Sequence, residues 1–334
     1  MRKSRVAAFA FLLVLVAAGG AGWVARDWYL APLPLPTSPF DFEVKAGASL
    51  ASVARRLQEA GVLPHAAALT WLARVRGADR TIKAGSYEIE TGVTLPRLLD
   101  KLTQGDVLQT AVTIVEGTTF AELRRALREN AQLAHETADW PDAQVLARIG
   151  ANETQPEGLF FPDTYFLSTG SSDLALLKRA YRLLHERLDA AWTRRAADLP
   201  LATAYDALIL ASIVEKETGH AGDRPLIASV FVNRLQRGMR LQTDPAVIYG
   251  MGSRFDGNLR KRDLETDTPY NTYLRDGLPP TPIAFPSQAS IDVVVNPPKT
   301  SYLYFVSRGD GTSEFSANLI EHNRAVSKYQ KSGR

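Results

Sequence analysis

The sequence predicts an α+β protein with an N-terminal membrane anchor, a small α/β domain and a larger mixed α/β domain. An uncharged apolar run covers about residues 6–25. A pattern of strand, glycine turn, hydroxyl cap and helix then recurs three times between residues 44 and 127. A nearly apolar helix is expected at 204–218, and it ends in two glutamates. With 334 residues, the chain is long enough for an anchor and two folded domains.

The N-terminus is predicted to hold a cytoplasmic stub and one transmembrane helix within residues 1–30. The run at 6–25 is long enough to cross a bilayer. Basic residues precede this run and place the N-terminus in the cytoplasm: Arg2, Lys3 and Arg5. Small residues at 17–22 leave a cleaved signal peptide as the alternative. We expect a single-pass protein of the inner (cytoplasmic) membrane, with its folded part in the periplasm.

Residues 31–40 follow the predicted span and are rich in proline. Four prolines fall within nine residues, a composition that favours an extended, semi-rigid spacer. We expect this linker to lift the folded part away from the membrane surface.

Composition excludes several classes of function. The hydrophobic fraction of 45% and the charged fraction of 22% are ordinary for a globular protein. A net charge of +3 without a basic cluster gives no indication of nucleic-acid binding. The chain has no cysteine, which excludes disulfides, thiolate metal sites and a cysteine nucleophile. The five histidines lack ligand spacing, so no metal site is expected.

The repeated pattern begins at Val44, Ile89 and Ile114. In each copy glycine follows at +3, Ser or Thr at +5, and apolar residues at +6, +9 and +13. This order predicts a strand, a glycine turn, a hydroxyl N-cap and an amphipathic helix. In the third copy Thr119 and Glu122 are spaced for a capping box.

The first copy resembles the opening of a LysM glycan-binding module over about twenty residues, where a strand runs into the first helix. A generic βα unit is the alternative interpretation. Residues 41–105 are therefore predicted to form a small LysM-like domain, and residues 106–330 a second domain. Further elements are expected along the second domain: strand and turn at 157–165, helices at 172–197 and 225–237, a loop-rich part after Gly238, a strand at 302–306 and a helix at 316–330.

The helix at 204–218 carries the strongest chemical indication. Its interior is apolar, so the helix should be buried. Gly219 is expected to end the helix, which places Glu215 and Glu217 in its last turn. The negative end of the helix dipole and the loss of solvation both raise a carboxyl pKa there, as a general acid requires. A solvated helix terminus is the alternative, and helix geometry does not choose between the two glutamates.

Three loop segments downstream, at 238–250, 267–273 and 277–283, are rich in hydrogen-bonding and aromatic side chains between glycines and prolines. Stiff loops of this composition are typical of a sugar-binding cleft. Ordinary turns are the alternative interpretation.

Several motifs together resemble the MltG (YceG-like) endolytic murein transglycosylases. These motifs lie at 157–158, 161–164, 211–218, 229–235, 239–245, 271–273, 277–280 and 302–306. The resemblance runs from about residue 40 to 328. The family's catalytic acid falls on the second glutamate of the helix, Glu217.

The resemblance implies a specific reaction. Such enzymes cut the β-1,4 bond between N-acetylmuramic acid and N-acetylglucosamine without water and leave a 1,6-anhydromuramic end. Glu217 would protonate the leaving oxygen and then accept the proton of the C6 hydroxyl. One carboxyl then suffices where most glycosidases need two.

We therefore expect a lytic transglycosylase that cleaves nascent peptidoglycan strands and so terminates their elongation, without a metal or an organic cofactor. Its expected partners are the glycan strands, the membrane and, by analogy, penicillin-binding peptidoglycan synthases. The alternatives are a non-catalytic peptidoglycan-binding scaffold, and a hydrolytic muramidase with Glu215 or Asp244 as its second carboxylate.

The expected substrate-contacting residues come from the same motifs. They are Glu157, Glu215, Gln242, Thr243, Asp244, Tyr249, Asn271 and Tyr273. We expect Gln242, Thr243, Asp244, Asn271 and Tyr273 in particular to line a cleft within reach of Glu217.

Overall fold

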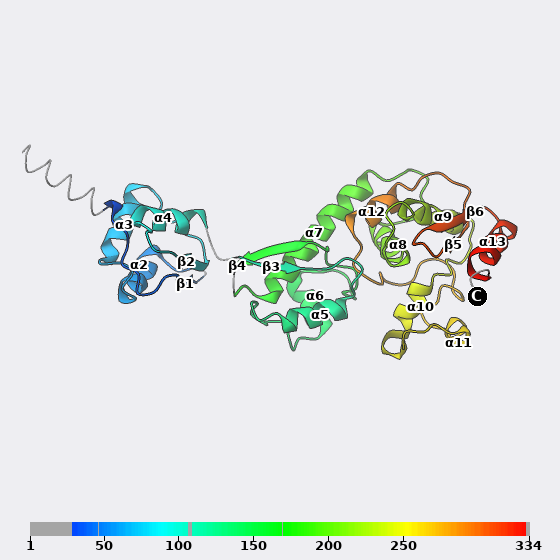
Figure 1. Ribbon diagram of the computed structural model, residues 1–334, viewed down its shortest axis with the longest axis horizontal. Helices are drawn as coiled ribbons and strands as arrows, with labels where there is room; N and C mark the ends of the chain where they lie inside the picture. Colours follow the sequence, from blue (N-terminus) through cyan, green and yellow to red (C-terminus); the bar gives the residue numbers. More distant parts are fainter. Residues whose placement is uncertain (1–28, 46, 106–108, 169, 332–334) are drawn as a thin grey trace, which may run out of the picture. The chain divides into compact units, whose positions relative to one another are not determined.

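A computed structural model describes residues 29–331 except 46, 106–108 and 169, and Figure 1 traces the chain. The span predicted at 6–25 lies outside the described residues. Within the described part, no helix is both long and apolar enough to cross a membrane. The chain divides into a small unit, up to residue 110 with 166–171, and a large unit, 111–165 with 172–334.

The small unit combines a two-stranded sheet with three helices. Its elements are β1 (Phe40–Val44), α2 (Leu50–Glu59), α3 (Ala66–Val75), β2 (Gly85–Ile89) and α4 (Leu95–Gln104). β1 and β2 are antiparallel, with Phe40 opposite Ile89 and Val44 opposite Gly85. α3 contacts both α2 and α4, and apolar side chains from all five elements form one buried core.

The strand, glycine turn and helix of the repeated pattern are confirmed in all three copies, but Thr94, at the N-cap of α4, makes no capping hydrogen bond with its side chain. The glycine of each copy, at positions 47, 92 and 117, has a positive φ of 78°, 92° and 71° respectively. Ser49 caps α2, and Thr119 forms the expected capping box with Glu122. The third copy belongs to the large unit from residue 111 on, where α5 (Phe120–Glu129) follows β3 (Gln109–Thr113). All the repeated apolar positions are buried.

The proline-rich segment differs from the predicted spacer, because it packs along the small unit. Leu33 N donates to Val93 O at 2.7 Å, and Pro32 forms a β-bridge with Thr94. Leu33 and Leu35 pack against the core. The leucines that alternate with the prolines give the segment an apolar side, and burying that side outweighs the tendency of the prolines to stand free in water.

The large unit is mostly helical. Its further elements are α6 (Asp142–Ile149), the start of β4 (Thr164–Ser168, of which 166–168 fall in the small unit), α7 (Asp173–Thr193), α8 (Ala204–Glu217), α9 (Arg224–Gln236), α10 (Asp244–Met251), α11 (Lys261–Leu264), α12 (Gln288–Val295), β5 (Tyr304–Ser307), β6 (Ser313–Ser316) and α13 (Leu319–Val326). β3 pairs with β4, and β5 with β6. The strand expected at 157–165 begins only at Thr164, and the residues before it form turns.

The predicted glutamate-bearing helix is α8, and it lies at the centre of the large unit. Every residue from Ala207 to Val214 is buried, and α7, α9 and α12 contact it (Figure 1). A capping box between Thr203 and Asp206 starts the helix. α10 and α12 were not expected, since the region after Gly238 was predicted to be loop-rich. Both are only eight residues long, and their helical period is too brief to recognise.

The C-terminal end of α8 is held by contacts with distant segments. Lys216 Nζ donates to Gly117 O at 2.9 Å, and Gly117 N donates to Phe285 O at 2.8 Å. One turn earlier, Ser212 Oγ accepts from Ile283 N at 3.0 Å. The last turn of α8 is therefore fixed in position within the large unit.

Candidate active site

A cavity of about 530 Å³ opens at the C-terminal end of α8. Its lining comes from α8, α9, the segment leading into α10, the loop around Tyr273, the β5 strand and α13. The polar and aromatic side chains that line it include Glu217, Arg234, Gln242, Asp244, Tyr273, Tyr304 and His322.

Glu217 is the last residue of α8, and its side chain is partly buried in this cavity. Burial raises the pKa of Glu217 to about 7, because the charged carboxylate loses solvation. The hydroxyl of Thr243 acts in the opposite direction, the charge of Asp244 raises the pKa further, and Arg234 lowers it. A carboxyl that titrates near neutral pH can both donate and accept a proton.

Thr243 fixes the orientation of the Glu217 carboxyl. Its hydroxyl donates to Oε1 of Glu217 at 2.5 Å, and the threonine itself is buried. Thr243 N in turn donates to Thr272 Oγ1 at 3.0 Å, which ties this segment to the loop that carries Tyr273. Because Oε1 already accepts a hydrogen bond, Oε2 is the oxygen left free to carry a proton.

Gln242 has an unusual backbone conformation beside the acid. Its φ is +53°, a left-handed conformation that a residue with a side chain rarely adopts. Gln242 N donates to Thr272 O at 3.1 Å, and Arg234 Nη1 donates to Gln242 Oε1 at 3.3 Å. Strain held in place by such contacts is typical of a functional site. Since Oε1 is engaged, the NH₂ group of Gln242 is the part of the amide left to donate to a ligand.

Arg234, Tyr304 and His322 form a stack at one side of the cavity. The Arg234 guanidinium lies 5.1 Å from the centre of the Tyr304 ring, and the His322 ring stacks on Tyr304 at 5.1 Å. Arg234 is buried, and its Nε donates to Leu303 O at 2.7 Å. Burial and the nearby Arg234 lower the pKa of His322, which favours the neutral imidazole.

The sequence prediction did not include these three residues. Arg234 and Tyr304 lie inside the motifs at 229–235 and 302–306, so the motif resemblance could have indicated them. His322 lies on α13, outside any motif, and no sequence signal pointed to it.

A second carboxylate, Asp244, lines the same cavity. Its Oδ1 accepts a hydrogen bond from the Tyr273 hydroxyl at 2.6 Å. Burial, followed by the hydrogen bond to Asp244, raises the pKa of Tyr273, so the phenol stays protonated. Gln242, Asp244 and Tyr273 thus line the cavity as the sequence predicted, and Thr243 contacts Glu217 directly.

Similarity to known proteins extends over most of the chain. The model of the YceG-like family matches residues 42–328. The chain belongs to the YceG-like family. It is 31% identical over 307 residues to the endolytic murein transglycosylase of Bacillus subtilis, a match that covers 86% of this chain and 84% of the relative. It is 27% identical to the endolytic murein transglycosylase of Streptococcus pneumoniae, with 99% of this chain and 66% of the relative covered.

A solved structure is also similar to this YceG-like chain. The crystal structure of a YceG-like protein from Listeria monocytogenes aligns with a TM-score of 0.53 and 28% sequence identity. The alignment covers 86% of this chain and 99% of that one. The mixed α+β architecture is therefore that of the YceG-like family.

Glu215 does not line the cavity of the YceG-like domain. Its Oε2 accepts hydrogen bonds from Ser287 N, Ser287 Oγ and Ser290 Oγ at 2.9, 2.5 and 2.7 Å. Arg224 Nη2 lies 3.8 Å from its other oxygen. Two residues along a helix point about 200° apart, so Glu215 and Glu217 face different surroundings. Glu215 joins α8 to the N-terminus of α12.

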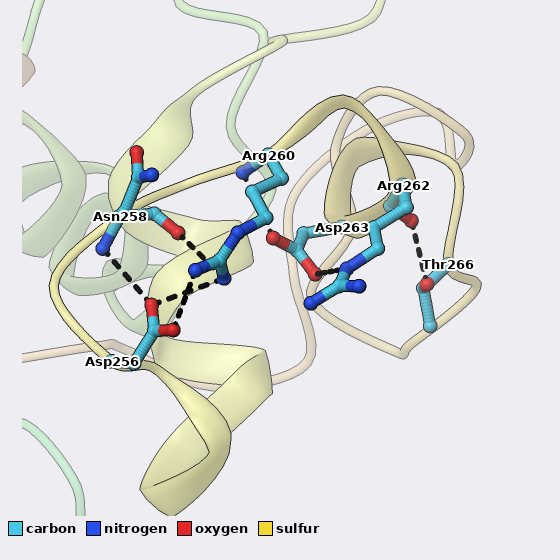
Figure 2. A network of polar contacts seen from close by, with 6 residues as sticks. All are labelled: Asp256, Asn258, Arg260, Arg262, Asp263 and Thr266. Carbon is cyan, nitrogen blue, oxygen red and sulfur yellow. Dashed lines mark hydrogen bonds and ion pairs between the residues drawn. The ribbon is translucent and has the colours of Figure 1, made fainter.

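Asn271 also differs from the expectation that it lines the cleft. It is fully buried, and its Nδ2 donates to Leu264 O at 3.0 Å and to Thr266 O at 2.7 Å. These bonds hold together the segment 252–270, between α10 and the Tyr273 loop. Figure 2 shows that charged side chains also cross-link this segment, with Arg260 Nη2 2.7 Å from Asp256 Oδ2. Asn271 Oδ1 also accepts from Tyr273 N at 2.9 Å, so Asn271 holds the loop that carries Tyr273.

Glu157 and Tyr249 belong to a different cavity, of about 330 Å³, which Phe120 and Arg124 also line. Glu157 Oε1 accepts from Phe120 N at 2.9 Å, and Tyr249 OH donates to Oε2 at 3.0 Å. Burial raises the pKa of Glu157 to about 7. Because Phe120 is the first residue of α5, Glu157 satisfies a free amide at the start of that helix. The contacts of Glu157 indicate a role in the fold.

Proposed function

We propose that this protein is an endolytic murein transglycosylase that cleaves the bond between N-acetylmuramic acid and N-acetylglucosamine in nascent peptidoglycan strands. The observation that carries the proposal is Glu217, a carboxyl with a pKa near 7 in an open cavity and with one oxygen bound by Thr243. The curated relatives named above are endolytic murein transglycosylases. Release of an anhydro end terminates elongation of the strand that is cut.

The site geometry suits a reaction in which one carboxyl first donates a proton and then accepts one. Protonated Glu217 donates from Oε2 to the glycosidic oxygen, and the bond from that oxygen to C1 of the muramic acid breaks. The C6 hydroxyl oxygen of the same sugar then bonds to C1, and its proton returns to Glu217. No water is consumed, and the product carries a 1,6-anhydro bridge. Glu217 ends protonated and ready for the next cycle.

Neighbouring residues orient the Glu217 carboxyl and offer contacts to the sugar rings. Thr243 holds the carboxyl through its hydroxyl, and Gln242 supplies an amide donor at the cavity wall. The Tyr273 ring and the Tyr304–His322 stack offer flat surfaces of the kind that pack against sugar rings.

The second candidate function is hydrolysis, because Asp244 lines the same cavity as Glu217. A hydrolase of the inverting type would use Asp244 as the base that activates water. Tyr273 donates to one oxygen of Asp244 and leaves the other available as a base, so the nature of the product has to decide between the two functions.

Product analysis in water enriched in heavy oxygen separates these functions. Purified glycan strands are incubated with the protein, and the new ends are weighed by mass spectrometry. The proposal predicts ends that are lighter by one water than hydrolysed ends and that carry no heavy oxygen. Ends that carry one heavy oxygen would establish hydrolysis, and unchanged strands would leave only a binding role.

We also propose that residues 6–25 anchor the protein in the cytoplasmic membrane, with the folded units in the periplasm. The basic residues before the apolar run support this orientation. The small unit is proposed to bind glycan in a LysM-like manner, supported by the passage of β1 into α2 and by a cavity of about 350 Å³ beside Phe40 and Phe42. Penicillin-binding synthases are proposed as partners by family analogy alone.

A further inference from the structure

One face of α3 in the small unit exposes large apolar side chains. Leu69, Leu72 and Ala73 pack into the core on the inner side of the helix. Trp71 and Val75, four residues apart and therefore on one stripe, are each 63% exposed. Single exposed apolar residues are common on protein surfaces, but an exposed tryptophan beside an exposed valine is the kind of feature that marks an interaction surface.

The charges around this stripe are mainly positive. Arg74, Arg76 and Arg80 are all exposed, and Asp79 is the acidic residue among them. Arg76 also forms an ion pair with Asp100 at 2.9 Å. A tryptophan with flanking arginines suits the boundary between lipid headgroups and acyl chains, where the ring lies at headgroup level and the guanidinium groups meet phosphates.

Tyr29, the first residue that the structure describes, is bound to the C-terminal end of α3. Arg76 Nη2 donates to Tyr29 OH at 2.5 Å, and Tyr29 packs against the core of the small unit. If the span ends near residue 25, only residues 26–28 separate it from Tyr29, a reach of at most about 14 Å. The proline-rich segment adds no distance, because it follows Tyr29 and is itself packed on the small unit.

We propose that the face of α3 formed by Trp71 and Val75 docks on the periplasmic surface of the cytoplasmic membrane. Trp71 enters the headgroup region, and the neighbouring arginines bind anionic lipid phosphates. The docking rests on the proposed anchor, which brings this face to the bilayer. The small unit then lies on the membrane surface. A free spacer would instead hold it away from that surface.

The absence of cysteine from the sequence allows a site-specific test in the full-length protein. Ala67→Cys, on the exposed stripe one turn before Trp71, is labelled with an environment-sensitive fluorophore. Glu59→Cys, exposed on α2, is the matched control. Each protein is reconstituted in vesicles of phosphatidylcholine and phosphatidylglycerol, with and without a lipid that carries a quencher near its headgroup.

The proposal predicts a blue-shifted emission at position 67 and quenching several times stronger than at position 59. Adding Trp71→Ser and Val75→Ser to the Ala67→Cys protein should reduce quenching to the level of the control. Both side chains are exposed, so these changes should leave the fold intact, which circular dichroism checks.

The failures of the anchor and of the docking can be told apart. If the protein floats with the vesicles but positions 67 and 59 are quenched equally, the docking is overturned and the anchor stands. If the protein does not float with the vesicles, the anchor fails and the docking fails with it. A blue shift at position 67 without lipid quenching would mean that protein covers this face, and it would also overturn the proposal.

Discussion

The hydroxyl of Thr243, the residue just before α10, donates at 2.5 Å to Oε1 of Glu217, the last residue of α8. This bond joins two motifs that lie 26 residues apart in the sequence. It stabilises the carboxylate form of Glu217 and leaves Oε2 to carry the proton. It therefore lowers the pKa against the effect of burial and orients the proposed catalytic acid.

Thr243→Val should move the pH dependence of cleavage. Loss of the donor removes a contact that lowers the pKa of Glu217, so this pKa should rise above about 7. Because the protonated form starts the reaction, the alkaline limb of kcat/KM should shift to higher pH, by about one unit for a hydrogen bond to a charged group. Thr243→Ser keeps the hydroxyl and should keep the wild-type profile. Identical profiles for the valine variant and the wild type would contradict this role.

Glu217→Gln should stabilise the fold at alkaline pH. The pKa of Glu217 is about 7 in the folded protein and about 4.5 when exposed, so folding favours the protonated form. This contribution is complete below pH 4.5 and is lost as the pH rises through 7. The neutral amide avoids the cost, and the gain at pH 8 should be roughly 1–2 kcal/mol after allowance for partial exposure.

Thermal unfolding of the wild type and the glutamine variant at pH 4 and pH 8 measures this effect. The variant should unfold at a higher temperature at pH 8, and the difference should shrink at pH 4. An equal difference at both pH values would contradict the raised pKa of Glu217 in the folded protein.

Glu215→Ala should destabilise the large unit without removing the chemistry. The carboxylate accepts three hydrogen bonds from Ser287 and Ser290, and its loss leaves those donors without their partner. We expect a loss of about 2–4 kcal/mol in the free energy of unfolding. Urea unfolding checks the size of the loss. A stability equal to that of the wild type would refute the role of Glu215 in joining α8 to α12.

Local sequence signals predicted the elements that depend on neighbouring residues. The three repeated copies and α8 were recognised because caps, glycine turns and helical periodicity act within about a dozen residues. The partners of Glu215 could not be predicted in this way, because they lie 72 and 75 residues further along the chain. The same holds for His322, which reaches the cavity only because α13 packs on β5.

The prediction for the proline-rich segment missed a tertiary contact. Proline content indicates an extended backbone, and the segment is extended at Leu33. It does not indicate whether that backbone stands free. The bond from Leu33 N to Val93 O depends on the turn between β2 and α4, and the packing of Leu33 and Leu35 depends on the core of the small unit; the segment's own sequence contains neither.

The rate at which Glu217→Gln forms anhydro ends on purified glycan strands tests the account most directly. Glu215→Gln is the matched control, since it changes the same atoms on the same helix turn. The account predicts that Glu217→Gln loses cleavage by a factor of at least roughly a hundred, while Glu215→Gln keeps most of it and both variants stay folded. Near wild-type formation of anhydro ends by Glu217→Gln would contradict the assignment of Glu217 as the acid.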